Sequence, residues 1–197
     1  MNPDFPELIT FVLITTFTPG PNNISSASMG ILFGYRKTIN YLLGIASGFF
    51  LIMFGSSLVS SSLFILFPNL EKIIRYLGAI YILWLAYRIA RSSYNFNESE
   101  QKAMNFMNGI LLQLLNPKAM VFGLTVFSLF LTPIDTSFQF NLSSAIVLTI
   151  VNFSATSSWT LFGTAIRKYL KNQRIKVIIN FILSVLLIVT AFQIAFV

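Results

Sequence analysis

TFTPGPNNISS, residues 16–26, places two prolines, a glycine and two asparagines inside a stretch that has no charged residue from Leu8 to Tyr35. Proline lacks a backbone N–H and interrupts an ordinary helix. In a membrane, such a break is tolerated where it is buried in protein or lines a wet cavity. The stretch therefore predicts a broken membrane helix whose backbone dipoles and Asn side chains face a ligand.

The composition of the whole chain indicates a lipid environment. Of 197 residues, 55% are hydrophobic and 10% are charged, and the mean hydropathy is +0.77, whereas soluble domains carry about 25% charged residues. A net charge of +7 could suggest a nucleic-acid partner. The basic residues instead lie in short clusters between apolar runs, as in cytoplasmic loops of membrane proteins. We therefore expect the lipid bilayer, and no nucleic acid, as a partner.

The residue types that the chain lacks exclude several kinds of chemistry. It has no Cys and no His, so thiolate metal sites, Cys nucleophiles and imidazole catalysis are excluded. Only six acids occur, and none lies deep within a predicted span. We therefore expect no metal site, no cofactor and no enzymatic activity. A Ser–Lys pair involving Lys118 stays open, although no Ser lies in a nucleophile-like motif.

Charged residues divide the sequence into six predicted spans, each needing about 20 residues. The third is long enough only if Arg75 and Arg88 extend to opposite interfaces. The expected fold is an all-α integral membrane protein of two inverted three-helix repeats with broken first helices. The spans are expected at about 8–35, 38–60, 71–90, 109–131, 142–166 and 177–196.

The distribution of basic residues predicts the topology. The odd-numbered loops hold ten Lys and Arg and the even-numbered loops hold two. The positive-inside rule then places both termini outside and the odd-numbered loops in the cytoplasm. The start of the chain has no Lys or Arg before the first apolar run, so we expect that run to be retained as a span.

A long polar segment, RSSYNFNESEQKAMN at residues 91–105, separates two groups of three spans. With an odd number of spans, the two groups must have opposite orientations, as in inverted-repeat transporters. We expect one transporter domain, 1–197, made of repeat one (about 5–90), a cytoplasmic linker (about 91–104) and repeat two (about 105–197).

A second break, Leu115-Asn116-Pro117-Lys118, lies in the first span of repeat two. Paired interruptions at corresponding positions are the best sequence indication of a transporter's substrate site. The alternative is that both prolines only shape helix packing. The predicted substrate-binding residues are Pro19, Gly20, Pro21, Asn22, Asn23, Asn116, Pro117 and Lys118.

Lys118 is the only ionisable residue deep within a predicted span. A charge at bilayer depth costs about 2.5–3.5 kcal/mol on insertion scales, so it needs a carbonyl, water or an incoming anion. Freed backbone carbonyls and Asn side chains could accept from a donor group of the same ligand. The alternative is that the span starts after Gln113 and Lys118 only reaches the cytoplasmic interface.

Two further patterns favour packing over ligand contact. Gly30 and Gly34, and likewise Gly44 and Gly48, have the spacing of close helix crossings. The hydroxyl residues clustered around Trp159 could line a polar path, but such groups often bond to their own helix.

The sequence resembles the LysE/RhtB superfamily of small bacterial amino-acid exporters over nearly its whole length. The similarity is carried by TPGPNN (18–23), GILFGYR (30–36), GIASGFF (44–50) and NGILLQLLNPKAMVFG (108–123). The resemblance implies a six-helix protein of the cytoplasmic membrane that exports amino acids or close derivatives by secondary transport.

Two departures leave the substrate branch open. Lys37 and Thr38 follow Arg36 where the family usually has Gly, and Pro133-Ile134-Asp135 stands where the family tends to PQF. A divalent-cation exporter of a related six-span family is an alternative, but such sites want acids, thiolates or imidazoles in the membrane. A non-transporting membrane assembly factor is another. The transported amino acid, the coupling ion and homo-oligomer formation are not predicted.

Overall fold

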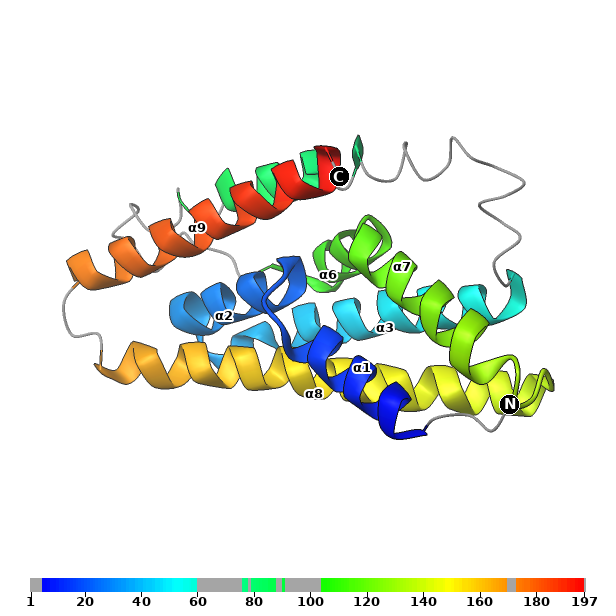
Figure 1. Cartoon of the computed structure of the whole chain (residues 1–197). Coiled ribbons are helices and arrows are strands. Elements are labelled where there is room, and N and C mark those ends of the chain that lie inside the picture. Colours follow the sequence, from blue (N-terminus) through cyan, green and yellow to red (C-terminus); the bar gives the residue numbers. More distant parts are fainter. Residues whose placement is uncertain are drawn as a thin grey trace.

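The computed structural model describes residues 5–59, 76–77, 79–87, 90, 104–169 and 173–196. Throughout these residues the regular structure is helical (Figure 1). Within the predicted third span, residues 71–75, 78, 88 and 89 lie outside the described residues, and 76–77, 79–87 and 90 are helical. The elements are α1 (Phe5–Phe17), α2 (Pro21–Phe33), α3 (Tyr35–Val59), α6 (Phe106–Leu114), α7 (Pro117–Thr125), the π-helix η1 (Val126–Leu131), α8 (Phe138–Tyr169) and α9 (Gln173–Phe196).

Two of the described helices, α3 and α8, are long and apolar enough to cross a membrane. Helix α6 and the segment Pro117–Leu131 would form a third span together, bent by 62° at their junction. Several helices extend beyond the predicted spans. Helix α3, for example, begins at Tyr35 and includes Arg36 and Lys37 in its first turn. Charged residues mark where the apolar run ends, whereas the helix continues into the interface.

Both predicted breaks are present as interruptions between short helices. The first separates α1 from α2, and Pro21 opens α2 at a position where its missing N–H is harmless. The second separates α6 from α7, which Pro117 opens in the same way. Gly34 differs from expectation: it ends α2 with φ of 77° rather than forming a helix crossing. This left-handed backbone turns the chain into α3 and favours glycine.

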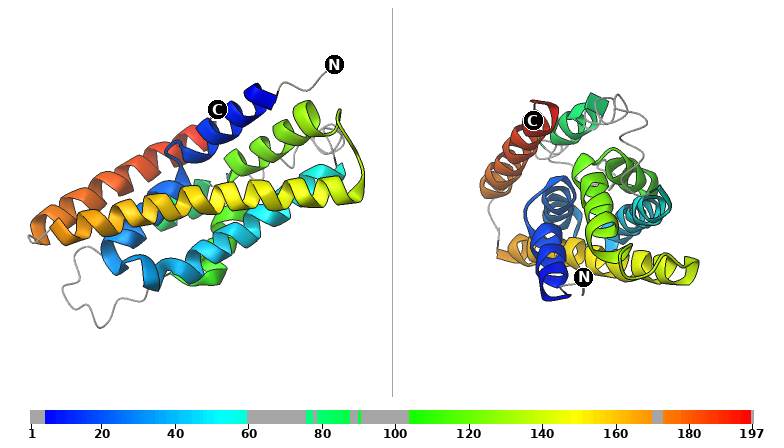
Figure 2. Two further views of the ribbon diagram at one scale, coloured as in Figure 1. Left: turned by 90° about the horizontal axis from the view of Figure 1, so that it is seen from below. Right: turned by 45° about the vertical axis from the view of Figure 1, so that its right-hand side comes forward.

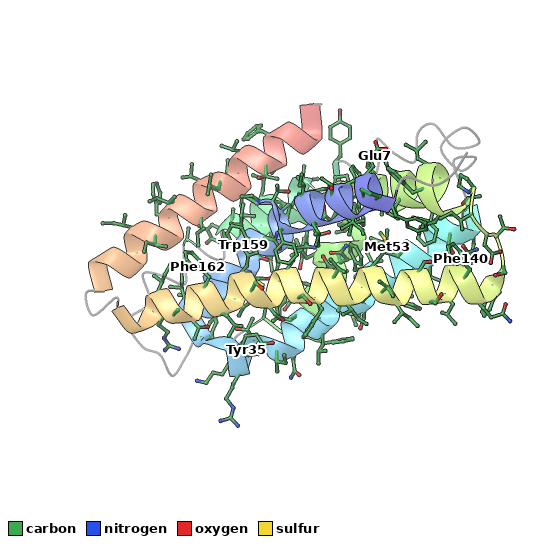
Figure 3. The ribbon with its side chains drawn as sticks, turned by 60° about the horizontal axis from the view of Figure 1, so that its bottom comes forward. Glu7, Tyr35, Met53, Phe140, Trp159 and Phe162 are labelled. Atoms are coloured by element: carbon green, nitrogen blue, oxygen red, sulfur yellow. The ribbon has the colours of Figure 1, made fainter. Side chains whose placement is uncertain are left out.

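Beside an apolar core, the fold buries several polar side chains and exposes many large apolar ones. Helix α2 is buried over 11 of its 13 residues, including Asn22, Asn23 and Ser25. Large apolar side chains such as Leu129 (68%) and Ile80 (64%) are exposed instead. Apolar side chains project outward along α8 and α9 (Figure 3). This arrangement suits a lipid environment, where polar groups must find hydrogen-bond partners inside the protein.

Glycines bring α2 against α8 at backbone distance. A Cβ placed on Gly30 would lie 2.2 Å from the Thr160 carbonyl oxygen. Reciprocally, a Cβ on Gly163 would lie 2.2 Å from the Ala27 carbonyl oxygen. Only glycine permits this approach, so the crossing depends on one glycine from each helix.

The crossing of α3 and α6 repeats this device. A Cβ on Gly44 would lie 2.0 Å from the Phe106 carbonyl oxygen, and one on Gly109 would lie 2.3 Å from that of Tyr41. The packing role predicted for Gly30, Gly44 and Gly48 is thus confirmed. In both crossings, a short helix beside a break packs against a long helix from the other half of the chain (Figure 2).

Candidate functional site

The two breaks, more than ninety residues apart in sequence, meet through three buried amide side chains. Asn22 Nδ2 donates to Gln113 Oε1, and Asn116 Nδ2 donates to Asn22 Oδ1 at 3.3 Å. All three side chains are buried. Because each amide pairs with a group across the junction, the network fixes the start of α2 against the end of α6 and the start of α7.

Asn116 also caps helix α7. Its Oδ1 accepts from the Lys118 backbone N–H at 3.1 Å, which is the usual role of Asn at a helix N-cap. Pro117 occupies the first helical position. The Asn-Pro-Lys sequence therefore has a local explanation: it starts a new helix immediately after α6 ends.

The carbonyl groups at the end of α1 are occupied by side-chain donors. Asn23 Nδ2 donates to the carbonyls of Thr16 and Thr18, both at 2.9 Å. Trp159 Nε1 on α8 donates to the Phe17 carbonyl at 3.2 Å (Figure 3). The sequence suggested that carbonyls freed by the break could receive a substrate amino group. In the structure, each of these three carbonyls already accepts one hydrogen bond, from Asn23 or Trp159, and keeps a second lone pair.

Lys118 spans the junction between the breaks. Its Nζ donates to Thr18 Oγ1 at 3.1 Å, and a Cβ placed on Gly20 would lie 3.4 Å from the same Nζ. The ammonium thus lies beside the first turn of α2. Helix α6 begins at Phe106, ahead of Gln113, and Lys118 lies in the first turn of the following helix, α7.

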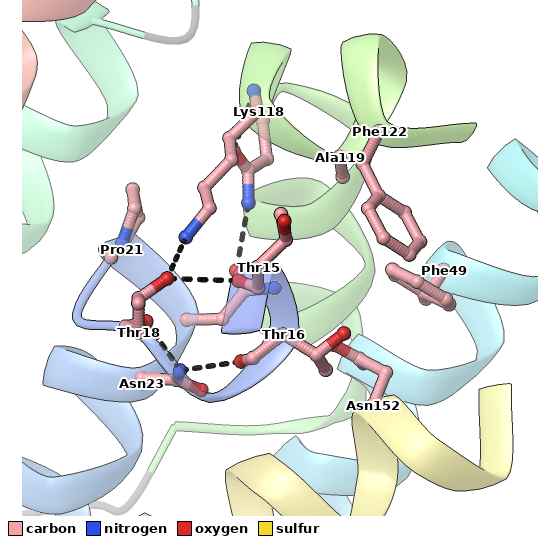
Figure 4. Close-up of a pocket in the computed structure, with 13 residues that line it drawn as sticks. Thr15, Thr16, Thr18, Pro21, Asn23, Phe49, Lys118, Ala119, Phe122 and Asn152 are labelled. Carbon is pink, nitrogen blue, oxygen red and sulfur yellow. Dashed lines mark hydrogen bonds between the residues drawn. The ribbon is translucent and has the colours of Figure 1, made fainter. Parts of the chain in front are cut away.

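A small cavity lined by both polar and apolar residues opens at this junction (Figure 4). Its volume of about 40 Å³ compares with the 10–15 Å³ that one water needs, so it holds a few waters. Of the described residues that line it, Lys118 alone carries a charge. The lining consists of Thr15, Thr16, Thr18, Gly20, Pro21, Asn22, Asn23, Phe49, Asn116, Lys118, Ala119, Phe122 and Asn152.

Six of the eight residues predicted from sequence line this cavity, and the other two, Pro19 and Pro117, flank it in the chain. The sequence analysis missed Gln113 in the amide network and Asn152 in the lining. Both are uncharged polar residues inside apolar spans. An uncharged amide inside an apolar run is therefore a sequence signal for such a site, as a charged residue or a proline is.

The hydroxyl cluster on α8 behaves as the packing interpretation predicts. Ser154, Ser158 and Thr160 each donate to the carbonyl four residues earlier, all at 2.8 Å. None of these three lines the cavity. Within the described ranges, no group of three or more His, Cys, Asp or Glu lies together as a metal site would require.

Known proteins were compared with this chain. A family model described as "LysE type translocator" matches residues 13–196. The chain is 31% identical to the cysteine/O-acetylserine efflux protein of Salmonella choleraesuis (strain SC-B67) over 185 residues, covering 94% of each protein. It is 29% identical to the protein of the same description from Escherichia coli (strain K12), with the same coverage. No solved structure matches. The family match over most of the sequence shows that the chain belongs to the LysE type translocators.

Proposed function

We propose that this protein is a secondary transporter that exports small amino acids with uncharged side chains, such as cysteine or O-acetylserine, across the bacterial cytoplasmic membrane. One observation carries the proposal: the broken helices of the two halves converge on a cavity whose described lining holds a single ammonium group, that of Lys118. The family match and the names of the relatives support amino-acid export.

The site suits an amino-acid carboxylate. Lys118 Nζ lies beside Gly20, the N-cap of α2, which offers no side-chain cap to that helix. The first turn of a helix attracts anions, because its N–H groups point outward and the helix dipole is positive there. A carboxylate at this point would meet both the ammonium and the start of α2.

The rest of the cavity suits an uncharged side chain. Phe49 and Phe122 form an apolar wall, with their ring centroids 5.9 Å apart. A lysine-like substrate would need an acid to receive its side chain, and the described lining contains none. Cysteine and O-acetylserine place no such demand on the site.

Transport requires the cavity to enlarge, since its present volume holds only a few waters. We propose six spans in two inverted repeats with both termini outside, so that the cavity opens alternately to each side. A reporter that is active only in the periplasm, fused to the C-terminus, should be active. An inactive reporter on a stable fusion would contradict the topology.

Uptake into inside-out membrane vesicles tests the activity itself, because the cytoplasmic face of the protein is then exposed to the label. Vesicles containing the protein should accumulate radiolabelled cysteine and O-acetylserine above vesicles from cells with an empty vector, and should not accumulate lysine. Comparison with and without a proton gradient identifies the coupling. Absence of uptake for every amino acid would refute the proposed function, and a preference for lysine would refute the proposed substrate class.

A further inference from the structure

Asn152, on α8, has a side chain that the fold leaves incompletely bonded. It lines the cavity and is only 5% exposed. Among the residues that the structure describes, its Nδ2 has no hydrogen-bond partner. Buried polar groups are nearly always paired, and a buried donor without an acceptor is unfavourable. An unpaired amide at the edge of a substrate cavity therefore suggests a partner that arrives with the ligand.

The position of Asn152 indicates which part of a ligand it would meet. Figure 4 shows Lys118 and Asn152 at opposite ends of the cavity, with Phe49 and Phe122 on the side of Asn152. A carboxylate held at Lys118 would leave the substrate side chain to extend toward Asn152. An amide N–H donates, so it cannot pair with an ammonium group but can pair with a carbonyl oxygen.

We infer that Asn152 is a specificity-determining residue that donates Nδ2–H to a carbonyl oxygen in the substrate side chain, and so favours acyl-bearing amino acids. This inference rests on the proposed function and names the substrate class of the same site. When the cavity enlarges around such a substrate, the carbonyl supplies the acceptor that the described state lacks. An otherwise identical side chain without the carbonyl leaves Nδ2 unpaired.

Two probes isolate the carbonyl. O-acetyl-L-serine and O-ethyl-L-serine have the same chain of heavy atoms, except that a methylene replaces the carbonyl carbon and its oxygen. Each is used to inhibit radiolabelled cysteine uptake into inside-out vesicles. Wild type should prefer the acetyl compound by about tenfold or more, the effect of one buried hydrogen bond. In Asn152→Leu, and in the smaller Asn152→Ala, the ratio of the two inhibition constants should fall to near unity, whatever level of cysteine uptake each variant keeps. Binding of the two probes to the purified variants gives the same ratio independently of transport.

Asn141 provides the matched control. It lies on the same helix, is 7% exposed and also has an unpaired amide atom, Oδ1, but it does not line the cavity. Asn141→Leu should keep the wild-type preference. The inference is overturned if the two probes inhibit uptake by wild type equally. It is also overturned if the Asn152 variants keep the preference for O-acetyl-L-serine. If wild type takes up no amino acid at all, the proposed function fails first, and the inference fails with it.

Discussion

At the scale of single residues, the site is organised by buried amides rather than by charges. Asn22 pairs with both Gln113 and Asn116, so one side chain joins three helices. The sequence predicted that Asn22 and Asn116 face a common site, because each stands beside a proline in an apolar run. It could not predict that they bond to each other, since the contact joins positions 94 residues apart.

Removing Asn22 tests this network. Asn22→Leu should lower the free energy of unfolding by about 1–3 kcal/mol, because buried donors and acceptors on Gln113 and Asn116 lose their partner. The measurement is thermal unfolding of the purified protein in detergent. Gln113→Leu should be less harmful in the Asn22→Leu background than in wild type, since its partner is already gone. Strictly additive effects of the two substitutions would show that the amides do not act together.

At the scale of helices, the fold depends on where glycine allows backbones to touch. The spacing of Gly30, Gly44 and Gly48 predicted close crossings, and the structure confirms them. The same spacing was misleading for Gly34, whose positive φ serves a turn. Sequence spacing also could not name the opposing helix, because lipid-exposed and protein-facing surfaces are both apolar here and carry no distinguishing period.

Alanine substitutions at Gly163 and Gly55 compare a glycine in a helix crossing with a glycine that has open space beside it. Gly163→Ala should lower stability by at least about 1–3 kcal/mol, because its Cβ would meet the Ala27 carbonyl and push α8 from α2. Gly55→Ala is the control: no atom lies within 4 Å of its new Cβ, so it should be neutral or stabilising by up to about 1 kcal/mol. Thermal unfolding of both variants is the measurement. Equal stability of the two would contradict the described crossing.

At the scale of the whole molecule, the two halves interlock. Helix α2 of the first half packs against α8 of the second, and α3 packs against α6 (Figure 1). The sequence predicted two halves, each with a broken first helix, from the paired prolines and the polar linker. It did not predict that helices of one half pack against helices of the other half. Tertiary contacts between apolar helices leave no local signature in the chain.

Separation of the halves should therefore abolish their stability but not their ability to recombine. Residues 1–97 and 98–197, expressed alone, should each accumulate poorly, because the glycine crossings join one half to the other. Expressed together, they should associate and restore amino-acid uptake in inside-out vesicles. Stable accumulation and transport by one half alone would contradict an interlocked fold.

The central claim is that the junction of the two broken helices binds the substrate carboxylate through Lys118. The most direct test measures binding of cysteine and of its uncharged carboxamide to purified wild type and to Lys118→Met. Wild type should bind cysteine far more tightly than the amide. Lys118→Met should lose this preference while keeping its thermal stability, because removing a half-buried charge offsets the loss of its hydrogen bond to Thr18. Equal discrimination between acid and amide by both proteins would contradict the claim and would place carboxylate recognition elsewhere.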